Sequence, residues 1–454
     1  MPFPSKMTPA GTALERSLDR RGSVARYRAN RRHTAELFDV VAPEAYETRP
    51  IELRNPIVFY EGHLPAFSVN TLLKKGLGRP GIDPRFEVLF ERGIDPEDES
   101  AVPGTPAWPS RDAIRAYGRA ADAAIVSALE KEDVAREDNP VLSGGLAVET
   151  ILEHERMHQE TLLYIWHRLP YDAKRAPLGT PRPVLGGEAP ERRTVRVPAG
   201  RATLGANRGE IPFGWDNEFQ EHSVDVGAFD VDVHDVTNRD YLEFVRAGGY
   251  DREDLWSEEG WQWRAEHGVD KPVFWERANG EFRWRGMFEE LPLPPAWPVF
   301  VSHAEASAYA RWRDARLPTE AEFHRAAYGT PSGAERAFPW GDEPPNPSHA
   351  NFGFATWDPV PVGSFPAGAS AWGVHDLLGN GWEWTSTVFG PFPGFEPMPS
   401  YPVYSADFFD GKHWVMKGGS LATGKELLRR SVRNWFRGNY PYVYATFRTV
   451  KATA

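Results

Sequence analysis

Four long segments in the first part of the chain carry apolar residues at the three- and four-residue spacing of an amphipathic helix. They cover residues 12–41, 56–76, 110–132 and 146–169. Segments rich in polar residues, proline and glycine separate them, which is typical of connections between helices. The pattern therefore predicts a four-helix bundle, and the interior of such a bundle is a common place for a bound metal.

Residues that favour helix ends stand at the borders of these segments. Pro56 lies near the start of the second segment and Ser110 directly before the third, where helix-start signals belong. Pro170 follows the fourth segment and disfavours helical backbone in the residue before it, so this helix is expected to end there.

The hydrophobic pattern changes at about residue 196. Apolar runs become short, and helical periodicity is confined to residues 236–248 and 301–315. The 17 Trp, 41 Gly and 41 Pro of the chain predict a region of short strands and loops packed around aromatic side chains. We find no internal repeat.

The length of 454 residues exceeds one ordinary hydrophobic core, so two domains are expected. A stretch rich in proline, glycine and charge separates the two patterns. We predict a helical domain at residues 1–175, a linker at 176–195 and a second domain at 196–454.

Composition narrows the classes of partner and chemistry. A net charge of −12 argues against nucleic-acid binding through phosphates. The chain has no cysteine, which excludes disulfides, thiolate metal sites and cysteine nucleophiles. It has no apolar run of the ~20 residues that cross a bilayer and no apolar stretch of a secretory signal near its start. We therefore expect a cytoplasmic protein with no membrane or nucleic-acid partner.

His154 and His158 stand four residues apart on the fourth predicted helix, so both side chains leave the same face and can bind one ion. Together with Glu155 they spell H-E-x-x-H, which in zinc peptidases combines two ligands with a catalytic base. That interpretation requires a third ligand further along, and the following residues lack the Gly-x-x-His form. The zinc peptidase therefore remains a remote alternative. Only in that alternative would Glu155 face the metal.

His63 is a candidate third ligand, because it lies among apolar residues of the second predicted helix, where an unpaired imidazole is costly. Three imidazoles leave about three open positions on an octahedral ion, which suits ferrous iron that binds O2 together with a substrate. Imidazole does not distinguish iron from zinc, so the metal stays open at this point.

Several motifs of the second half resemble the formylglycine-generating-enzyme-like fold, which is related to C-type lectins. In chain order they are "VDVHDVTNRDYLEFVRAGGY", "RLPTEAEFHRAAYG", "FPWGDE", "GVHDLLGNGWEWTST", and "MKGGSLATG" with "RRSVRNWF" and "ATFRTV". The resemblance implies an α+β domain whose motifs are mostly scaffold. Thr319 and Glu322, for example, have the spacing of a helix capping box. The paired cysteines of the true formylglycine-generating enzymes are absent, which excludes that activity.

A DinB-like helical bundle with one His and a His-x-x-x-His pair, placed before this fold, resembles the non-haem iron sulfoxide synthases. These enzymes form the C–S bond of ergothioneine (the EgtB type) or of ovothiol (the OvoA type). The resemblance implies Fe(II) held by His63, His154 and His158, with O2 as co-substrate. A non-catalytic, lectin-like ligand-binding protein with a structural metal is the alternative from another functional class.

The segments "LRNPIVFYEGHLPAFSVNTLL", "GIDPRFEVLFERGIDPED", "HERMHQET" and "FFDGKH" look closer to the ovothiol branch, the 5-histidylcysteine sulfoxide synthases. We therefore expect oxidative coupling of cysteine to the imidazole ring of histidine. The alternative is an ergothioneine-type enzyme that joins cysteine or γ-glutamylcysteine to hercynine, and a selenium donor also stays open. No segment resembles the methyltransferase domain that usually follows in the ovothiol branch, so a separate methyltransferase is the expected pathway partner.

The resemblance also implies residues that act on the substrates. In "PGFEPMPSYPVYS" it assigns proton transfer to Tyr401 and pocket lining to Tyr404. In "RNWF" it places Asn434 and Trp435 against the imidazole substrate.

Two positions depart from the ergothioneine branch, and one further role is assigned on general grounds. Phe436 replaces an acidic residue and Met157 a polar one near the substrate, and both departures favour histidine, although Phe436 can still offer a cation–π face. The carboxylate of the thiol needs a basic partner, and Arg79 and Arg85 follow the helix of His63.

Overall fold

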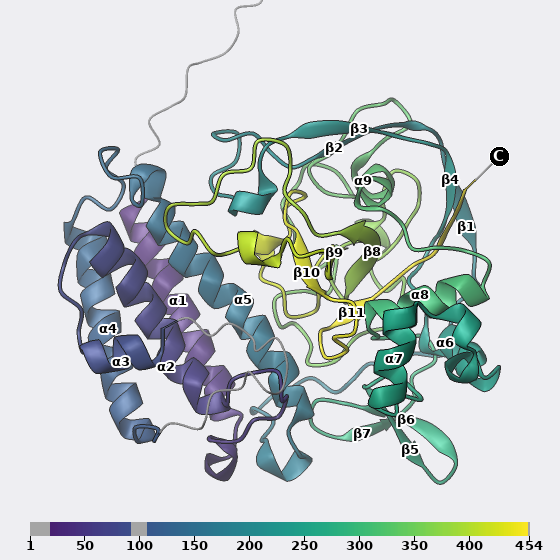
Figure 1. Ribbon diagram of the computed structural model, residues 1–454, viewed down its shortest axis with the longest axis horizontal. Coiled ribbons are helices and arrows are strands. Elements are labelled where there is room, and N and C mark those ends of the chain that lie inside the picture. Colours follow the sequence, from purple (N-terminus) through teal and green to yellow (C-terminus); the bar gives the residue numbers. More distant parts are fainter. Residues whose placement is uncertain (1–18, 92–106, 453–454) are drawn as a thin grey trace, which may run out of the picture.

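The computed structural model describes residues 19–91 and 107–452 of the chain. A bundle of helices lies beside a larger part built from short strands, loops and helices, as Figure 1 shows. The predicted helical domain followed by an α+β domain is thus confirmed.

In residues 19–91 and 107–168, the helical part contains four long α-helices and one short one. Their bounds are α1 Arg20–Asp39, α2 Ile57–Ser68, α3 Pro84–Leu89, α4 Arg111–Lys131 and α5 Leu146–Arg168. The predicted first residues of α1, 12–18, lie outside the described residues. After Ser68 the second helix continues as a wider π-helical stretch, Val69–Gly76.

The predicted helix ends are confirmed. Pro56 is the N-cap residue of α2, and the Ser110 hydroxyl accepts a hydrogen bond from the backbone N–H of Ala113 at 3.3 Å at the start of α4. Leu169, directly before Pro170, is the extended residue that closes α5. Each end thus follows from chemistry within one turn of the chain.

The second part, as described up to residue 452, contains four small sheets and four α-helices. The sheets have the orders β1-β4-β12, β10-β9-β8-β11, β2-β3 and β5-β6-β7. The strands are β1 Thr194–Val197, β2 Gly200–Leu204, β3 His222–Val226, β4 Phe229–Asp232, β5 Trp275–Ala278, β6 Glu281–Arg285, β7 Glu290–Pro292, β8 Trp382–Val388, β9 His413–Lys417, β10 Asn434–Arg437, β11 Ala445–Thr446 and β12 Val450–Ala452. The helices are α6 Asn238–Arg246, α7 Glu258–Glu266, α8 His303–Trp312 and α9 Glu320–Tyr328.

Helix α7 corrects the prediction that helical pattern is confined to two segments of this region. Its nine residues bury only Gly260 and Trp263, so no apolar stripe marks it in the sequence. The Ser257 hydroxyl starts it by accepting from the N–H of Gly260 at 3.1 Å. The predicted capping box of α9 is confirmed, because Thr319 and Glu322 each accept from the backbone N–H of the other.

Helix α5 belongs to the cores of both parts. The largest cluster of buried apolar side chains includes Trp166 near its C-terminal end together with Trp284, Trp384 and Tyr444 of the second part. Figure 1 shows α5 as the bundle helix that faces the strands. Residues on one face of α5 therefore lie between the two parts.

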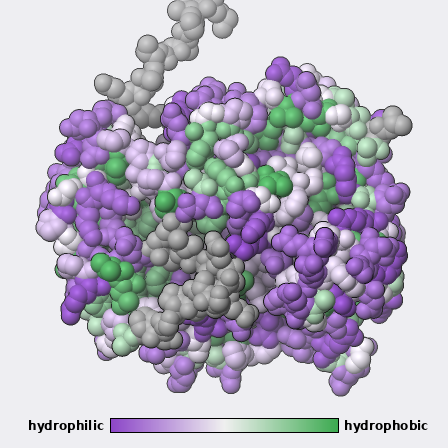
Figure 2. Space-filling model, viewed as in Figure 1, coloured by the Kyte–Doolittle hydropathy of each residue, from purple (hydrophilic) through white to green (hydrophobic). Residues whose placement is uncertain are grey.

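The face of the molecule in Figure 2 is mostly hydrophilic, with apolar residues in small separate patches. Among the described residues, no helix has the length and apolar character needed to span a bilayer. Residues 175–193, which include most of the predicted linker, form neither helix nor strand.

Candidate active site

His63, His154 and His158 lie together between α2 and α5. One ring nitrogen of each lies within 4.8 Å of the others, and the ring centroids are 4.4 to 5.2 Å apart. The pair on α5 is brought together by the four-residue spacing of one helical turn. His63 joins it because α2 packs against α5.

Burial keeps the three rings in the neutral form that binds metals. It lowers the pKa of His63, and it lowers the pKa of His154 and His158 well below the usual value, with neighbouring positive charge adding to the effect. The Nδ1 of His63 lies 3.0 Å from the backbone carbonyls of Phe90 and Glu91, so Nδ1–H donates there and Nε2 keeps its lone pair. Three neutral imidazoles with open lone pairs fit a divalent transition metal.

Glu155 of the H-E-x-x-H motif lies on the other side of α5. Its carboxylate accepts from Arg31 at 2.9 Å and from the Thr34 hydroxyl at 2.6 Å, both on α1. The side chain is buried. Glu155 links two helices of the bundle and is not directed at the histidines.

The second part closes the site with Tyr401. Its ring lies 6.2 Å from that of His154 and 5.2 Å from that of Phe67, which stacks on His154 at 3.5 Å. Tyr404 lies one turn further along the loop, and its hydroxyl donates to the sulfur of Met157 at 3.3 Å. Both tyrosines therefore approach the face of α5 that carries the histidines.

A cavity begins at Met157 and continues along the same face of α5. Its walls are largely apolar and aromatic, with Glu160 as its one carboxylate among the described residues. The lining residues are Met157, Glu160, Thr161, Tyr164, Trp215, Trp382, Tyr404, Leu427, Val432, Arg433, Asn434, Phe436 and Val443.

Glu160 was given no role from the sequence, although it lines the cavity and its carboxylate accepts three hydrogen bonds. Its carboxylate accepts from Trp382 Nε1 at 2.7 Å, from the Ser420 hydroxyl at 2.6 Å and from the Thr423 hydroxyl at 2.7 Å. Burial raises its pKa, whereas these three hydrogen bonds lower it. The spacing of Met157, Glu160 and Tyr164 on one helical face was the signal available in the sequence.

Alternation along β10 separates the residues predicted from "RNWF". Asn434 and Phe436 line the cavity, as expected for pocket residues. Trp435 points to the other side of the strand and stacks on Phe389 at 4.1 Å. Trp435 is absent from the lining of this cavity in the described part of the chain, and it packs behind the cavity, with its ring 5.3 Å from that of Tyr404. Its direct contact with substrate stays a prediction.

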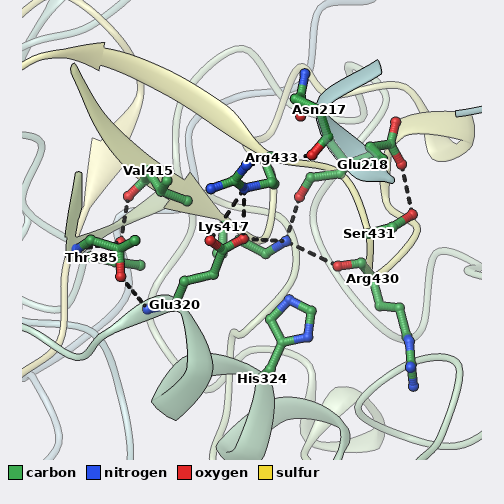
Figure 3. A network of polar contacts seen from close by, with 12 residues as sticks. Asn217, Glu218, Glu320, His324, Thr385, Val415, Lys417, Arg430, Ser431 and Arg433 are labelled. Carbon is green, nitrogen blue, oxygen red and sulfur yellow. Dashed lines mark hydrogen bonds and ion pairs between the residues drawn. The ribbon is translucent and has the colours of Figure 1, made fainter. Parts of the chain in front are cut away.

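Buried ionic contacts hold β10 in place, as Figure 3 shows. The Arg433 guanidinium donates to Glu320 at 3.0 Å, and Lys417 donates to the backbone carbonyl of Arg430 at 3.0 Å. Burial lowers the pKa of Lys417 to about 8. These groups position the strand that presents Asn434 and Phe436.

A second ionic group connects the histidine helix with the other part. Glu153, next to His154, accepts from Arg429 at 2.7 Å and from Trp215 Nε1 at 2.9 Å. Trp215 in turn stacks on Tyr404 at 4.0 Å. Burial raises the pKa of Glu153 to about 7, although Arg429 opposes the shift.

The two arginines expected to bind the thiol carboxylate have other partners in the structure. Arg79 is paired with Glu132 at 2.6 Å, and Arg85, in the first turn of α3, with the N-cap residue Asp83 at 2.9 Å. Arg85 is 87% exposed, and neither arginine lines the cavity beside the histidines. Nearby carboxylates thus hold both side chains at the surface, and a role of either in binding the thiol carboxylate stays a prediction.

Comparison with known proteins agrees with this two-part architecture. The model of the DinB superfamily matches residues 26–162, and that of the sulfatase-modifying factor enzyme 1-like domain matches residues 184–453. The chain is 38% identical over 394 residues to the hercynine oxygenase of Mycolicibacterium smegmatis, covering 84% of this chain and 88% of that one. The chain belongs to the hercynine oxygenase family of sulfoxide synthases. It is accordingly an oxidoreductase, and the peptidase and lectin-like alternatives are not supported.

Two further members show the range of the family. The hercynine oxygenase of Mycobacterium tuberculosis is 37% identical, with 88% of this chain and 91% of that chain covered. Ergothioneine biosynthesis protein 1 of Neurospora crassa is 30% identical, with 89% of this chain and 54% of that chain covered. These relatives favour the ergothioneine-type alternative over the histidine-specific, ovothiol-type reaction that the sequence motifs first indicated.

Proposed function

We propose that the protein is an O2- and Fe(II)-dependent sulfoxide synthase that joins an amino-acid thiol, cysteine or γ-glutamylcysteine, to the imidazole ring of hercynine. The observation that carries this proposal is the cavity beside the three histidines, with its aromatic walls and its single buried carboxylate. The names of the relatives support the same substrate.

The contacts of Glu160 favour hercynine over histidine. A carboxylate has about four acceptor positions, and Trp382, Ser420 and Thr423 already use three of those of Glu160. The primary ammonium of histidine needs hydrogen-bond acceptors, and little capacity remains for it. A trimethylammonium donates no hydrogen bonds and needs only nearby negative charge and aromatic faces, which Glu160 and Phe436 provide.

Phe436 and Met157 first favoured histidine as the substrate, but their positions in the cavity favour hercynine. Both line the cavity, where Phe436 offers an aromatic face and Met157 a polarisable sulfur fixed by Tyr404. An apolar wall of this kind suits a bulky quaternary cation. The loss of an acidic residue after Trp435 is offset by the carboxylate of Glu160 on α5.

The reaction balances without a reducing cofactor. The thiol S–H and one imidazole C–H are lost, a C–S bond forms, one atom of O2 is added to sulfur and the other leaves as water. Ferrous iron held by His63, His154 and His158 would supply the activation of O2. Tyr401 holds a proton at the edge of this site, and the buried cavity orients the imidazole and excludes bulk water.

The test is product formation after anaerobic loading with Fe(II) and admission of air. Hercynine with cysteine, hercynine with γ-glutamylcysteine, and histidine with cysteine are compared by mass spectrometry. We expect a sulfoxide from hercynine with kcat/KM at least tenfold above that for histidine. The reverse preference would establish the histidine-specific reaction, and no sulfoxide in any mixture would overturn the proposal.

A further inference from the structure

Tyr401 lies in a long connection that contains little regular structure. Residues 389–412 join β8 to β9, and η10 (Ala406–Phe408) is their only helix or strand. The backbone hydrogen bonds near the tyrosine are local, from the N–H of Tyr401 to Met398 and from that of Tyr404 to Tyr401. No sheet or helix holds Tyr401, so side-chain contacts, its own with Phe67 and His154 and those of its neighbours, set its position.

The residue before Tyr401 is tied to the histidine helix. Ser400 is fully buried, and its hydroxyl lies 2.8 Å from that of Thr150 on α5. Thr150 donates its own hydrogen to the carbonyl of Leu146 at 2.7 Å, so Ser400 is the donor to Thr150. Thr150 precedes His154 by four residues, which places it one turn away on the same face of the helix.

The other side of the tyrosine segment is tied to η6 (Asp216–Glu218). The Ser405 hydroxyl donates to the carboxylate of Asp216, and the backbone N–H of Met398 lies 3.4 Å from the same group. Asp216 is 1% exposed, so these contacts are shielded from water. Met398 packs with Trp215 in a small apolar cluster that also contacts Tyr401 and Tyr404.

We propose that Thr150, through Ser400, and Asp216, through Ser405, form a two-point clamp that positions Tyr401 against the histidine triad. The two hydroxyls bracket the tyrosine, and their partners belong to different parts of the fold. Thr150 acts as a positioning residue, because its hydrogen bond with Ser400 fixes the tyrosine loop relative to the helix that carries His154 and His158. The sequence pattern T-x-x-x-H-x-x-x-H on α5 therefore combines the loop anchor with two ligands.

The clamp affects which product forms, the sulfoxide or a sulfinic acid, and this consequence rests on the proposed function. If the proton is not delivered as the C–S bond forms, O2 can instead oxidise the thiol to a sulfinic acid. That product incorporates both oxygen atoms and leaves the imidazole unchanged. A misplacement of about 1 Å at a reacting group can cost about 100-fold in rate. The clamp thus selects sulfoxide over sulfinic acid by holding Tyr401 in place.

The variant Thr150→Val keeps the shape of the side chain and removes the hydroxyl, while Thr150→Ser restores it. Ser405→Ala tests the second point. We expect Thr150→Val and Ser405→Ala each to lower the ratio of sulfoxide to sulfinic acid at least fivefold, with KM for the thiol changed less than twofold. Thr150→Ser should return the ratio to within twofold of the natural protein.

The matched control is Thr385→Val. Thr385 is also a fully buried threonine, and its hydroxyl donates to a backbone carbonyl, that of Val415 at 2.8 Å. It lies within β8 and makes this contact with β9 and not with the tyrosine loop. We expect its product ratio to equal that of the natural protein. A shift in this control equal to that of Thr150→Val would show a general effect of lost buried hydroxyls and overturn the clamp.

Amide hydrogen exchange in the metal-free protein gives a readout that does not depend on the reaction. In Thr150→Val and Ser405→Ala, peptides covering residues 396–409 should exchange at least tenfold faster, with the rest of the fold unchanged. Unchanged exchange and an unchanged product ratio would overturn the clamp. If the natural protein forms no sulfoxide, the proposed function fails, and the exchange experiment still decides whether the clamp exists. Should Thr150→Val not fold, Ser405→Ala carries both measurements.

Discussion

The ring of Tyr401 stands at 73° to the ring of His154, with their centroids 6.2 Å apart, although the two residues belong to different parts of the fold. Neither part contains the site by itself. The bundle supplies three imidazoles, and the second part supplies the tyrosine and most of the cavity wall. The reactive geometry therefore depends on how α5 and the tyrosine loop are held together.

Replacing Tyr401 by Phe is expected to lower sulfoxide formation by about 100-fold or more, because a positioned proton donor contributes about that factor. Thiol oxidation to sulfinic acid should persist, since it leaves the imidazole unchanged and does not form the C–S bond that Tyr401 assists. Product ratios by mass spectrometry check this outcome. Tyr404→Phe is the control: it removes the hydroxyl that contacts Met157 and should retain most of the sulfoxide activity.

Removing one imidazole should empty the metal site without unfolding the bundle. We expect His63→Ala to reduce bound iron from about one ion per chain to below about a tenth, because a chelate of three neutral imidazoles loses a ligand. Iron analysis after anaerobic loading measures this, with circular dichroism as the check on folding. His303→Asn, which changes another buried histidine remote from the triad, should keep its iron. Equal iron in both variants would contradict the three-ligand assignment.

Glu160→Gln keeps the shape of the carboxylate and removes its charge. We expect the Kd for hercynine to rise about tenfold, corresponding to ~1.4 kcal/mol of lost attraction for the quaternary cation. Tryptophan fluorescence of the metal-free protein provides the measurement, because Trp215 and Trp382 line the same cavity. Glu155→Gln, on the other side of α5, is the matched control and should leave this Kd unchanged. An unchanged Kd in Glu160→Gln would remove the argument for hercynine.

Glu155→Gln should act on stability and not on chemistry. It leaves the guanidinium of Arg31 with Asp122 alone, and breaking a buried ion pair of this kind costs about 2–3 kcal/mol. Urea unfolding measures the change, and sulfoxide formation should remain within a factor of two. Loss of a casein-cleaving activity in this variant would instead restore Glu155 as the base of a peptidase.

Some of the fold followed directly from local patterns. The four long helices carry apolar residues at helical spacing, and Ser110 and Thr319 mark helix starts through contacts within three residues. Helix α7 was not predicted from its sequence pattern, because it buries too few side chains to show an apolar stripe. Periodicity reports burial of a face, so it is silent where a helix is largely exposed.

The site was predicted unevenly for a related reason. Arg79 and Arg85 follow the helix of His63, where a basic partner was expected, yet Glu132 and Asp83 hold them at the surface. Glu160 received no role, although it lines the cavity. The partner of a charged side chain comes from a distant segment, and spacing along the chain does not reveal it.

By itself the sequence determined the four long helices of the bundle, the helix starts at Ser110 and Thr319, the pairing of His154 with His158 on one face and the family resemblance of both parts. Only the tertiary structure decided that Glu155 binds Arg31, that Glu160 faces the cavity, that Trp435 lies behind it and that Ser400 is tied to Thr150. Local propensity and spacing act over one or two turns of chain. The contacts that define the site join separate segments of the chain, 124 positions apart for Arg31 and Glu155 and 250 for Thr150 and Ser400, and packing of the complete core selects them.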